Sequence, residues 1–190
     1  MTISRFLLSL ALTFAAGVAA QAGVSEQVLA EMNLARTQPQ QYAQYLAAES
    51  RPGRDTEEAI RFLQKAKPLP PLGSSIGLGQ SSMLHVSTQG PIGGRGHGGF
   101  GNSPFTRMNK FGQYVGYAGE NIYYGRGSAR SIVCTLIVDA GVSDRGHRKN
   151  IFSANYGVAG VATGPHATYG SLCVIDFAGQ YVERGATAGL

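Results

Sequence analysis

The chain has 190 residues, of which 43% are hydrophobic and 14% charged, and its formal net charge at pH 7 is +5. This mild excess of positive charge comes without a long run of lysine or arginine, a basic helix or a zinc-finger spacing. The composition therefore does not indicate a nucleic-acid-binding protein, and it suits an acidic surface or a polysaccharide only weakly.

The first 20 residues have the pattern of a secretory signal peptide. Arg5 precedes an apolar run from Phe6 to Ala16, and small residues that suit cleavage follow it. The run is short for a membrane span, although an uncleaved N-terminal anchor is the alternative. No later stretch is apolar for long enough to cross a bilayer. We therefore expect a secreted or periplasmic protein with no transmembrane segment after cleavage, and about 170 residues are enough for one domain.

The only two cysteines, Cys134 and Cys173, are predicted to form a disulfide, because an even number in an exported protein favours pairing. Closing a loop of about 40 residues stabilises a fold by about 4 kcal/mol in the chain-entropy model. Two buried free thiols are the alternative, since both cysteines lie in apolar runs. A metal site made from them is not expected, because neither has a second ligand at close spacing.

The N-terminal half is predicted to be helical. Apolar residues recur at helical spacing over 24–36, and Thr37 is the expected N-cap of a second helix from Pro39 to Leu46. Acids at the start of 55–67 and lysines at its end suit the helix dipole. A further helix is expected over 74–87.

A glycine-rich loop follows at residues 90–102, and its glycines allow the backbone to approach a ligand closely. It resembles neither a Walker loop nor a dinucleotide-binding fingerprint. Beyond it we expect a short helix over 103–112, an extended segment over 114–124, and an apolar helix that Ser128 caps and Asp139 ends.

The last third changes to strands. One more helical turn is expected at 146–152, then strands over 156–162 and 171–182 separated by a turn at Gly164-Pro165. Helices followed by a late antiparallel sheet predict an α+β fold, layered as an α-β-α sandwich. We expect one domain over 24–182 and a C-terminal tail over 183–190.

Two histidines and two acids from separate segments indicate a polar cleft. His97 lies in the glycine-rich loop, Glu120 in the tract Gly-Glu-Asn-Ile, Asp139 at the end of the apolar helix, and His147 in the tract Gly-His-Arg-Lys-Asn. Arg148 and Asn150 are expected to hold the loop that presents His147.

Each of these residues also has a simpler interpretation. His97 would otherwise be an exposed loop residue and His147 a helix cap. Glu120 would pair with Arg107 or Arg148, and Asp139 with Arg145 or Arg148. Of the two remaining histidines, His85 is expected in the core and His166 in an exposed hairpin turn.

The order of several motifs resembles the CAP superfamily, also called the SCP-like extracellular domain, in its bacterial branch. This superfamily includes cysteine-rich secretory proteins, antigen 5 and plant pathogenesis-related proteins. The resemblance covers nearly the whole chain after the leader. It is carried by Met32-Asn33-Leu34-Ala35-Arg36, His97, Arg107, Gly119-Glu120-Asn121-Ile122, the helix ending in Asp139, Gly146-His147-Arg148-Lys149-Asn150-Ile151 and Gly157-Val158-Ala159-Gly160-Val161-Ala162.

The resemblance implies an α-β-α sandwich with a cleft lined by His97, Glu120, Asp139 and His147. Many members have a glutamate where Asp139 stands, so the acid is one methylene shorter here. Family members with this tetrad bind metal, which implies Zn²⁺ or another divalent cation on His97 and His147. The two acids would then orient the imidazoles from behind.

We therefore expect a non-catalytic CAP protein whose cleft binds a divalent metal and an extracellular ligand such as a lipid, a polysaccharide or a protein. One alternative is a metal-assisted hydrolase of peptide or cell-envelope polymer, in which Glu120 activates a metal-bound water. Another is a lipid or sterol carrier with an apolar groove.

Overall fold

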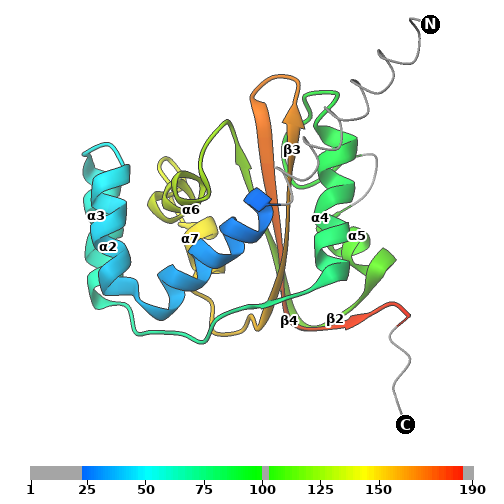
Figure 1. Ribbon diagram of the computed structural model, residues 1–190, viewed down its shortest axis with the longest axis horizontal. Coiled ribbons are helices and arrows are strands. Elements are labelled where there is room, and N and C mark those ends of the chain that lie inside the picture. The colour runs from blue at the N-terminus through cyan, green and yellow to red at the C-terminus, as the bar shows by residue number, and fades with distance from the viewer. Residues whose placement is uncertain (1–22, 100–102, 186–190) are drawn as a thin grey trace, which may run out of the picture.

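A four-stranded sheet separates two layers of helices in the computed structural model, which describes residues 23–99 and 103–185 (Figure 1). The leader predicted over 1–20 and the last five residues of the predicted tail lie outside this part of the chain. The α+β class and the α-β-α layering are confirmed. No helix in the described part of the chain is long and apolar enough to cross a membrane.

The sheet has the strand order β1-β3-β4-β2, so β4 is central and β2 lies at one edge. β4 pairs antiparallel with both β2 and β3, whereas the two-residue β1, which was not predicted, runs parallel to β3. The strands are β1 (Gly73–Ser74), β2 (Gly112–Tyr124), β3 (Val158–His166) and β4 (Gly170–Glu183).

The turn predicted at Gly164-Pro165 is wrong, because β3 continues to His166 and pairs with β4 as far as Gly170. β1 covers only Val158 and Ala159 of β3. Among the described residues no strand therefore flanks β3 at Pro165 on that side, where a missing N–H costs no ladder hydrogen bond. The chain instead turns at residues 167–169.

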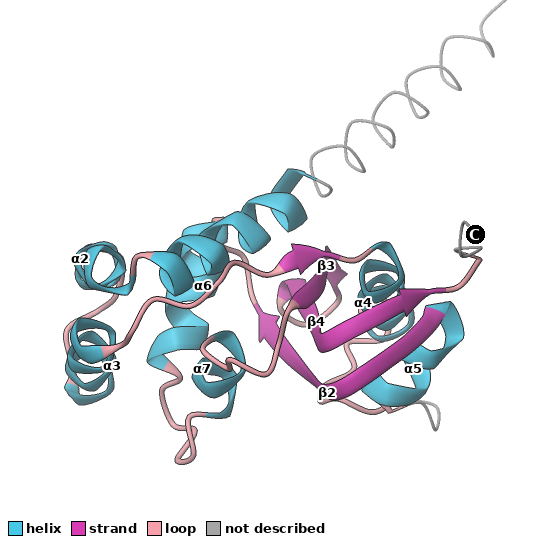
Figure 2. Cartoon of the chain, turned by 90° about the horizontal axis from the view of Figure 1, so that it is seen from below, coloured by secondary structure: helices cyan, strands magenta, loops and turns pink. Residues whose placement is uncertain are grey.

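One face of the sheet is covered by α4 (Ile76–Gln89) and α5 (Pro104–Phe111), as Figure 2 shows. Serines start both helices: Ser75 Oγ accepts from Leu78 N and Ser103 Oγ from Thr106 N. α4 lies very close to β3, since a Cβ added at Gly160 would come within 2.0 Å of the backbone nitrogen of Gly79.

The opposite face is covered by the helix over residues 23–37 and by α2 (Pro39–Glu49), α3 (Arg54–Lys65), α6 (Ala129–Val138) and α7 (Gly146–Ile151). These elements enclose the larger apolar core. Its fully buried members include Val28, Met32, Leu46, Leu63, Val133, Ile137, Ile151, Ile175 and Phe177.

The predicted N-cap of α2 is wrong. Thr37 is the last residue of the preceding helix, and its hydroxyl donates to the carbonyl of Asn33 at 2.7 Å. The N-cap position falls to Gln38, whose side chain makes no capping hydrogen bond. Pro39, by contrast, occupies the first turn as predicted.

The predicted disulfide between Cys134 and Cys173 does not form, and both residues are buried free thiols. The thiol of Cys134 donates instead to the hydroxyl of Tyr42 in α2, with the sulfur 3.8 Å from the oxygen. Cys173 lies in β4 opposite Tyr123. Burial raises the pKa of Cys134 to about 11 and that of Cys173 to about 12, so both stay protonated at neutral pH.

The layer between the sheet and α4 contains two small apolar clusters rather than one. One lies around Leu172 and Val174, the other around Leu78 and Ala178. Asp176 lies between them on the same face of β4, because alternate residues of a strand share a face. The polar residues buried in this layer include Ser81, His85, Arg107, Glu120 and Asp176.

Candidate functional site

His97 and Glu120 form the first of two histidine–acid pairs. The Nδ1 atom of His97 lies 2.9 Å from Oε1 of Glu120, and the other carboxylate oxygen accepts a short hydrogen bond from Arg107 of α5. The side chain of His97 is 52% exposed, whereas that of Glu120 is 1% exposed. The pair thus joins a solvent-facing imidazole to a buried carboxylate.

Glu120 keeps its charge despite its burial. Burial alone would raise its pKa, but the hydrogen bond to His97 and the nearby charge of Arg107 outweigh that effect. The pKa of Glu120 therefore lies below its ordinary value of 4.5. Of the two partners that the simpler interpretation offered for Glu120, Arg107 is the one that pairs with it.

The glycine-rich loop that carries His97 is held at three successive places. Nε2 of His166 lies 2.8 Å from the carbonyl oxygen of Gly94, and the backbone nitrogen of Gly96 donates to the hydroxyl of Tyr124 at 2.8 Å. Arg107 donates to the carbonyl of His97 itself at 3.0 Å. Gly96 has φ +82°, a conformation that favours glycine. His97 is therefore an anchored loop residue.

His166 does not lie in an exposed turn, contrary to the prediction. It is 3% exposed, and its Nδ1 atom accepts hydrogen bonds from the backbone nitrogens of Thr168 and Tyr169. Its ring therefore carries its proton on Nε2 and donates it to Gly94 in the loop. The other remaining histidine, His85, is buried in α4, as predicted.

Asp139 and His147 form the second pair. Oδ1 of Asp139 lies 2.6 Å from Nδ1 of His147, and Oδ2 accepts from the backbone nitrogens of His147 and Arg148. Asp139 ends α6 in the left-handed conformation, with φ 53° and ψ 43°. This turn brings its short side chain to the first turn of α7, so the aspartate reaches His147 without the extra methylene of a glutamate.

Arg148 supports this second pair, as predicted. It is buried, and its guanidinium donates to the carbonyls of Ile137 and Val138 at the end of α6, at 2.5 and 3.1 Å. Its charge is balanced by Glu58 of α3 rather than by Asp139 or Glu120.

Two asparagines connect α7, which carries His147, to the edge strand β2. The side-chain nitrogen of Asn121 donates to the carbonyl of His147 at 2.9 Å, and that of Asn150 donates to the side-chain oxygen of Asn121 at 2.8 Å. Glu120 faces α5 and its neighbour Asn121 faces α7, because consecutive residues of a strand point to opposite faces. The two histidine–acid pairs thus lie on opposite sides of the edge strand.

Each acid of the predicted tetrad meets its own histidine. Because Nδ1 of each ring is occupied by a carboxylate, Nε2 is the nitrogen that remains for a ligand. Within residues 23–99 and 103–185, no three His, Cys, Asp or Glu side chains form a group that could hold a metal ion.

Asp176 belongs to the surroundings of the first pair and was not predicted. It lies opposite Glu120 in the sheet and is fully buried. Burial, and then the charge of Glu120, raise its pKa well above the ordinary value. Burial and the charge of Glu120 therefore favour the protonated form of Asp176. Its signal in the sequence is a lone acid within the apolar run Leu-Cys-Val-Ile-Asp-Phe.

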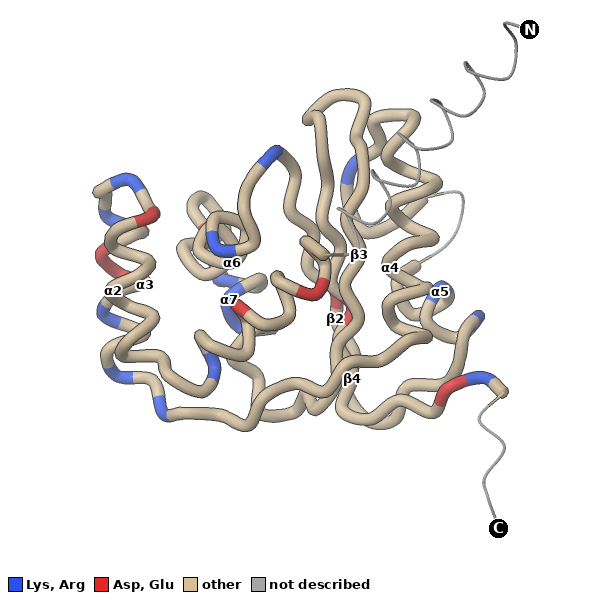
Figure 3. The backbone as a smooth tube through the Cα atoms, in the orientation of Figure 1, with Lys and Arg blue, Asp and Glu red and all other residues tan. Residues whose placement is uncertain are grey.

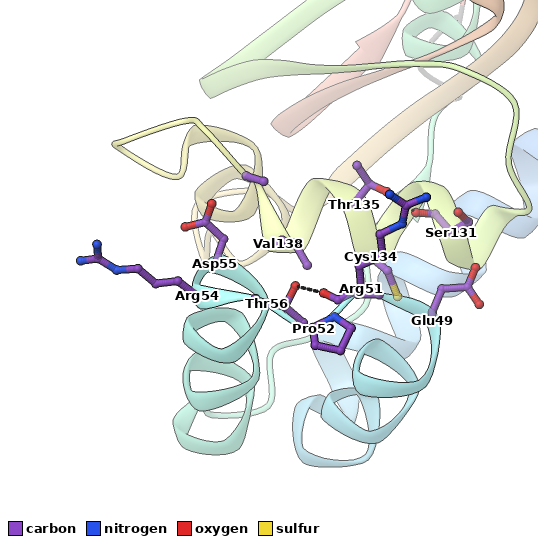
Figure 4. Close-up of a pocket in the computed structure, with 13 residues that line it drawn as sticks. Glu49, Arg51, Pro52, Arg54, Asp55, Thr56, Ser131, Cys134, Thr135 and Val138 are labelled. Carbon is purple, nitrogen blue, oxygen red and sulfur yellow. Dashed lines mark hydrogen bonds between the residues drawn. The ribbon is translucent and has the colours of Figure 1, made fainter.

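A pocket of about 510 Å³ lies elsewhere, between the α2–α3 connection and α6 (Figure 4). Its lining includes neither His97 nor His147. Charged residues border it at Glu49, Arg51 and Arg54. The pocket is thus separate from both histidine–acid pairs.

Comparison with protein families gives one match. A family model described as the cysteine-rich secretory protein family (CAP) matches residues 29–177. No curated protein matches the sequence.

Similar solved structures include three bacterial proteins. An outer surface protein from Borrelia burgdorferi is 17% identical with a TM-score of 0.48, over 58% of this chain and 78% of that one. An extracellular protein containing an SCP domain from Bacillus anthracis is 18% identical with a TM-score of 0.47, over 65% of this chain and 38% of that one. A cysteine-rich secretory protein from Staphylococcus aureus is 12% identical with a TM-score of 0.42, over 75% and 39%. This chain thus matches well under half of the length of the last two.

Proposed function

The chain belongs to the CAP family of cysteine-rich secretory proteins, and we propose that it is an exported protein that binds a divalent metal ion, such as Zn²⁺, through Nε2 of His97 and of His147. One observation carries this proposal: a buried carboxylate holds Nδ1 of each ring, at 2.9 Å for His97 and 2.6 Å for His147. Imidazoles that bind metals usually donate their other N–H to a carboxylate or carbonyl in this way.

Two imidazole ligands suit a metal ion of intermediate softness that keeps coordination positions open to other ligands. A neutral imidazole that donates from Nδ1 keeps its lone pair on Nε2, the form that binds zinc, copper or nickel. Two protein ligands leave the remaining positions of a bound ion to water or to a group of an extracellular ligand. We expect the ion to be exchangeable, and the ligand to be a lipid, a polysaccharide or a protein outside the cytoplasm.

Metal binding is a better-supported function than hydrolysis. A general base must have an oxygen within reach of the proton that it removes. Both oxygens of Glu120 are already engaged, one by His97 and one by Arg107, and its side chain is 1% exposed. We therefore assign Glu120 to orienting His97.

Calorimetric titration of the metal-stripped protein with zinc tests this proposal. We expect about one equivalent to bind, and either His97→Ala or His147→Ala to remove most of the affinity. Lys149→Ala is the matched control, because Lys149 is an exposed residue of α7 two positions from His147. Binding that is unchanged in both histidine variants would contradict the proposal.

A further inference from the structure

Two arginines flank His147 and fix the turn between α6 and α7. Arg145 precedes α7 in the left-handed conformation, with φ 54°, and Arg148 follows His147 within the helix. Arg145 donates to the carbonyls of Asp139 and Val142 at 2.7 and 3.3 Å. Such donors satisfy the carbonyls that the end of a helix leaves without intrahelical partners.

The same two arginines are joined by one carboxylate from α3. Glu58 accepts from Arg148 with both oxygens, at 2.6 and 2.9 Å, and from Nε of Arg145 at 3.1 Å. Asp55, one turn earlier in α3, accepts from Arg145 at 2.5 Å. A bidentate pair fixes the orientation of a guanidinium as well as its position. α3 therefore sets how both arginines hold the chain around Asp139.

The side chains of Arg148 and Glu58 differ strongly in solvent exposure. Arg148 is 4% exposed, whereas Glu58 is 40% exposed. An exposed carboxylate alone contributes little to stability, but removing the charge that balances a buried guanidinium has a larger local effect. If Glu58 becomes neutral, Arg148 must seek other acceptors or water. It then releases the end of α6, where Asp139 holds His147.

We propose that Glu58 of α3 is a positioning residue for His147, acting through Arg145 and Arg148 on the turn that presents Asp139. The expected effect on metal affinity rests on the proposed function, because a better oriented His147 binds a metal more tightly. The positioning of His147 by Glu58 does not require a metal. α3 therefore supports the pair of Asp139 and His147, and the pair of His97 and Glu120 does not depend on it.

The structural part is tested on the metal-free protein by reaction with diethyl pyrocarbonate, with each modified histidine quantified by peptide mass spectrometry. We expect Glu58→Gln to raise the modification rate of His147 about threefold or more, because its ring is less firmly held, and to leave that of His97 unchanged. Glu57→Gln is the matched control. Glu57 is in the same helix, is 66% exposed and pairs only at 3.8 Å with Arg61.

Two results would overturn the inference. One is a His147 rate in Glu58→Gln equal to that in Glu57→Gln. The other is an equal rise at His97 and His147, which would indicate general loosening. Circular dichroism at the reaction temperature checks that Glu58→Gln is folded. Asp55→Asn, which removes only the second partner of Arg145, should give a smaller rise at His147 and serves if Glu58→Gln is unfolded.

Zinc affinity tests the functional consequence separately. We expect Glu58→Gln to weaken binding about threefold or more, less than the tenfold or larger loss that is typical when a direct partner of a ligand is removed. In a His147→Ala background the same substitution should have no further effect. If the wild-type protein binds no zinc, the proposed function fails, while the modification rates still decide whether Glu58 positions His147.

Discussion

Glu120 and Asp176 lie opposite each other on β2 and β4, and the pKa values of these two buried carboxyl groups are shifted in opposite directions. His97 and Arg107 hold the pKa of Glu120 below its ordinary value, whereas burial and the charge of Glu120 raise that of Asp176 well above its own. Two adjacent carboxylates in a low-dielectric interior cannot both ionise at little cost. Protonation of Asp176 therefore favours the anionic form of Glu120 beside His97.

Replacing Asp176 with asparagine should stabilise the protein increasingly as pH rises. A raised pKa in the folded state means that the wild-type protein has its full stability below the pKa of the unfolded chain, about 4. That stability is then lost as pH rises through the folded pKa. Asparagine does not titrate, so urea unfolding at pH 4, 5.5 and 7 should show a growing advantage for Asp176→Asn. An advantage that does not change with pH would show that Asp176 is not the titrating group.

Replacing Glu120 with glutamine should destabilise the protein by about 3 kcal/mol, because it leaves the buried guanidinium of Arg107 without its balancing charge. The loss should be large at pH 7 and should shrink below about pH 4, where the wild-type carboxyl also becomes neutral. Urea unfolding at both pH values measures it. Glu57→Gln, an exposed control, should change stability little at either pH.

The ion pairs of α3 should give an acid-sensitive contribution to stability. The hydrogen bond from Arg148 lowers the pKa of Glu58, and that from Arg145 lowers the pKa of Asp55. A lowered folded-state pKa gives stability that is present above the unfolded value, about 4, and is lost as pH falls through the folded value. Chemical unfolding of wild type and Glu58→Gln should therefore differ at pH 7 and converge near pH 3. A difference that persists at pH 3 would contradict this explanation.

Gly119→Ala should be destabilising by about 1–3 kcal/mol. A Cβ at this position would lie 2.5 Å from the hydroxyl oxygen of Tyr156 and 3.3 Å from the side-chain oxygen of Asn150. Tyr156→Phe removes the hydroxyl, so it should recover much of the loss in the double variant. Thermal unfolding of the four proteins of this cycle gives the coupling energy.

Gly160→Ala should also destabilise the protein, but Tyr156→Phe should not restore its stability. Its Cβ would meet the backbone of α4, at Gly79, so there is no single side chain whose truncation makes room. We expect a loss at least as large as that of Gly119→Ala and no recovery with Tyr156→Phe. Recovery there would show that Tyr156→Phe stabilises the fold for an unrelated reason.

Features that depend on neighbouring residues were predictable from the sequence. Ser128 caps α6 as predicted, because a cap needs only a hydroxyl and the next turn of backbone. The family resemblance predicted His97, Glu120, Asp139 and His147 as site residues from the order of short motifs, and each histidine lies beside one of the two acids. The predicted N-cap at Thr37 was wrong because one helix ends there, immediately before the next begins.

Features that depend on distant partners were not predictable in the same way. Nothing local assigns Glu58 to Arg148, which is 90 residues away, rather than to the adjacent lysines and arginines. The proline that suggested a turn at Gly164-Pro165 is accommodated because β1 is only two residues long. The disulfide prediction was wrong because the sulfur of Cys134 points to Tyr42 of α2. The spacing of two cysteines along the chain does not show in which direction their side chains point.

The position of β2 at the edge of the sheet has a consequence for any ligand that contacts both histidines. His97 lies on the side of the sheet that α4 and α5 cover, whereas His147 lies in the first turn of α7 on the opposite side, next to the edge strand β2. A molecule held by both rings would pass around the rim of the sheet and cross-link the two layers. Amide hydrogen exchange would then slow in α4 and α7 together, although no backbone hydrogen bond joins those helices directly among the described residues.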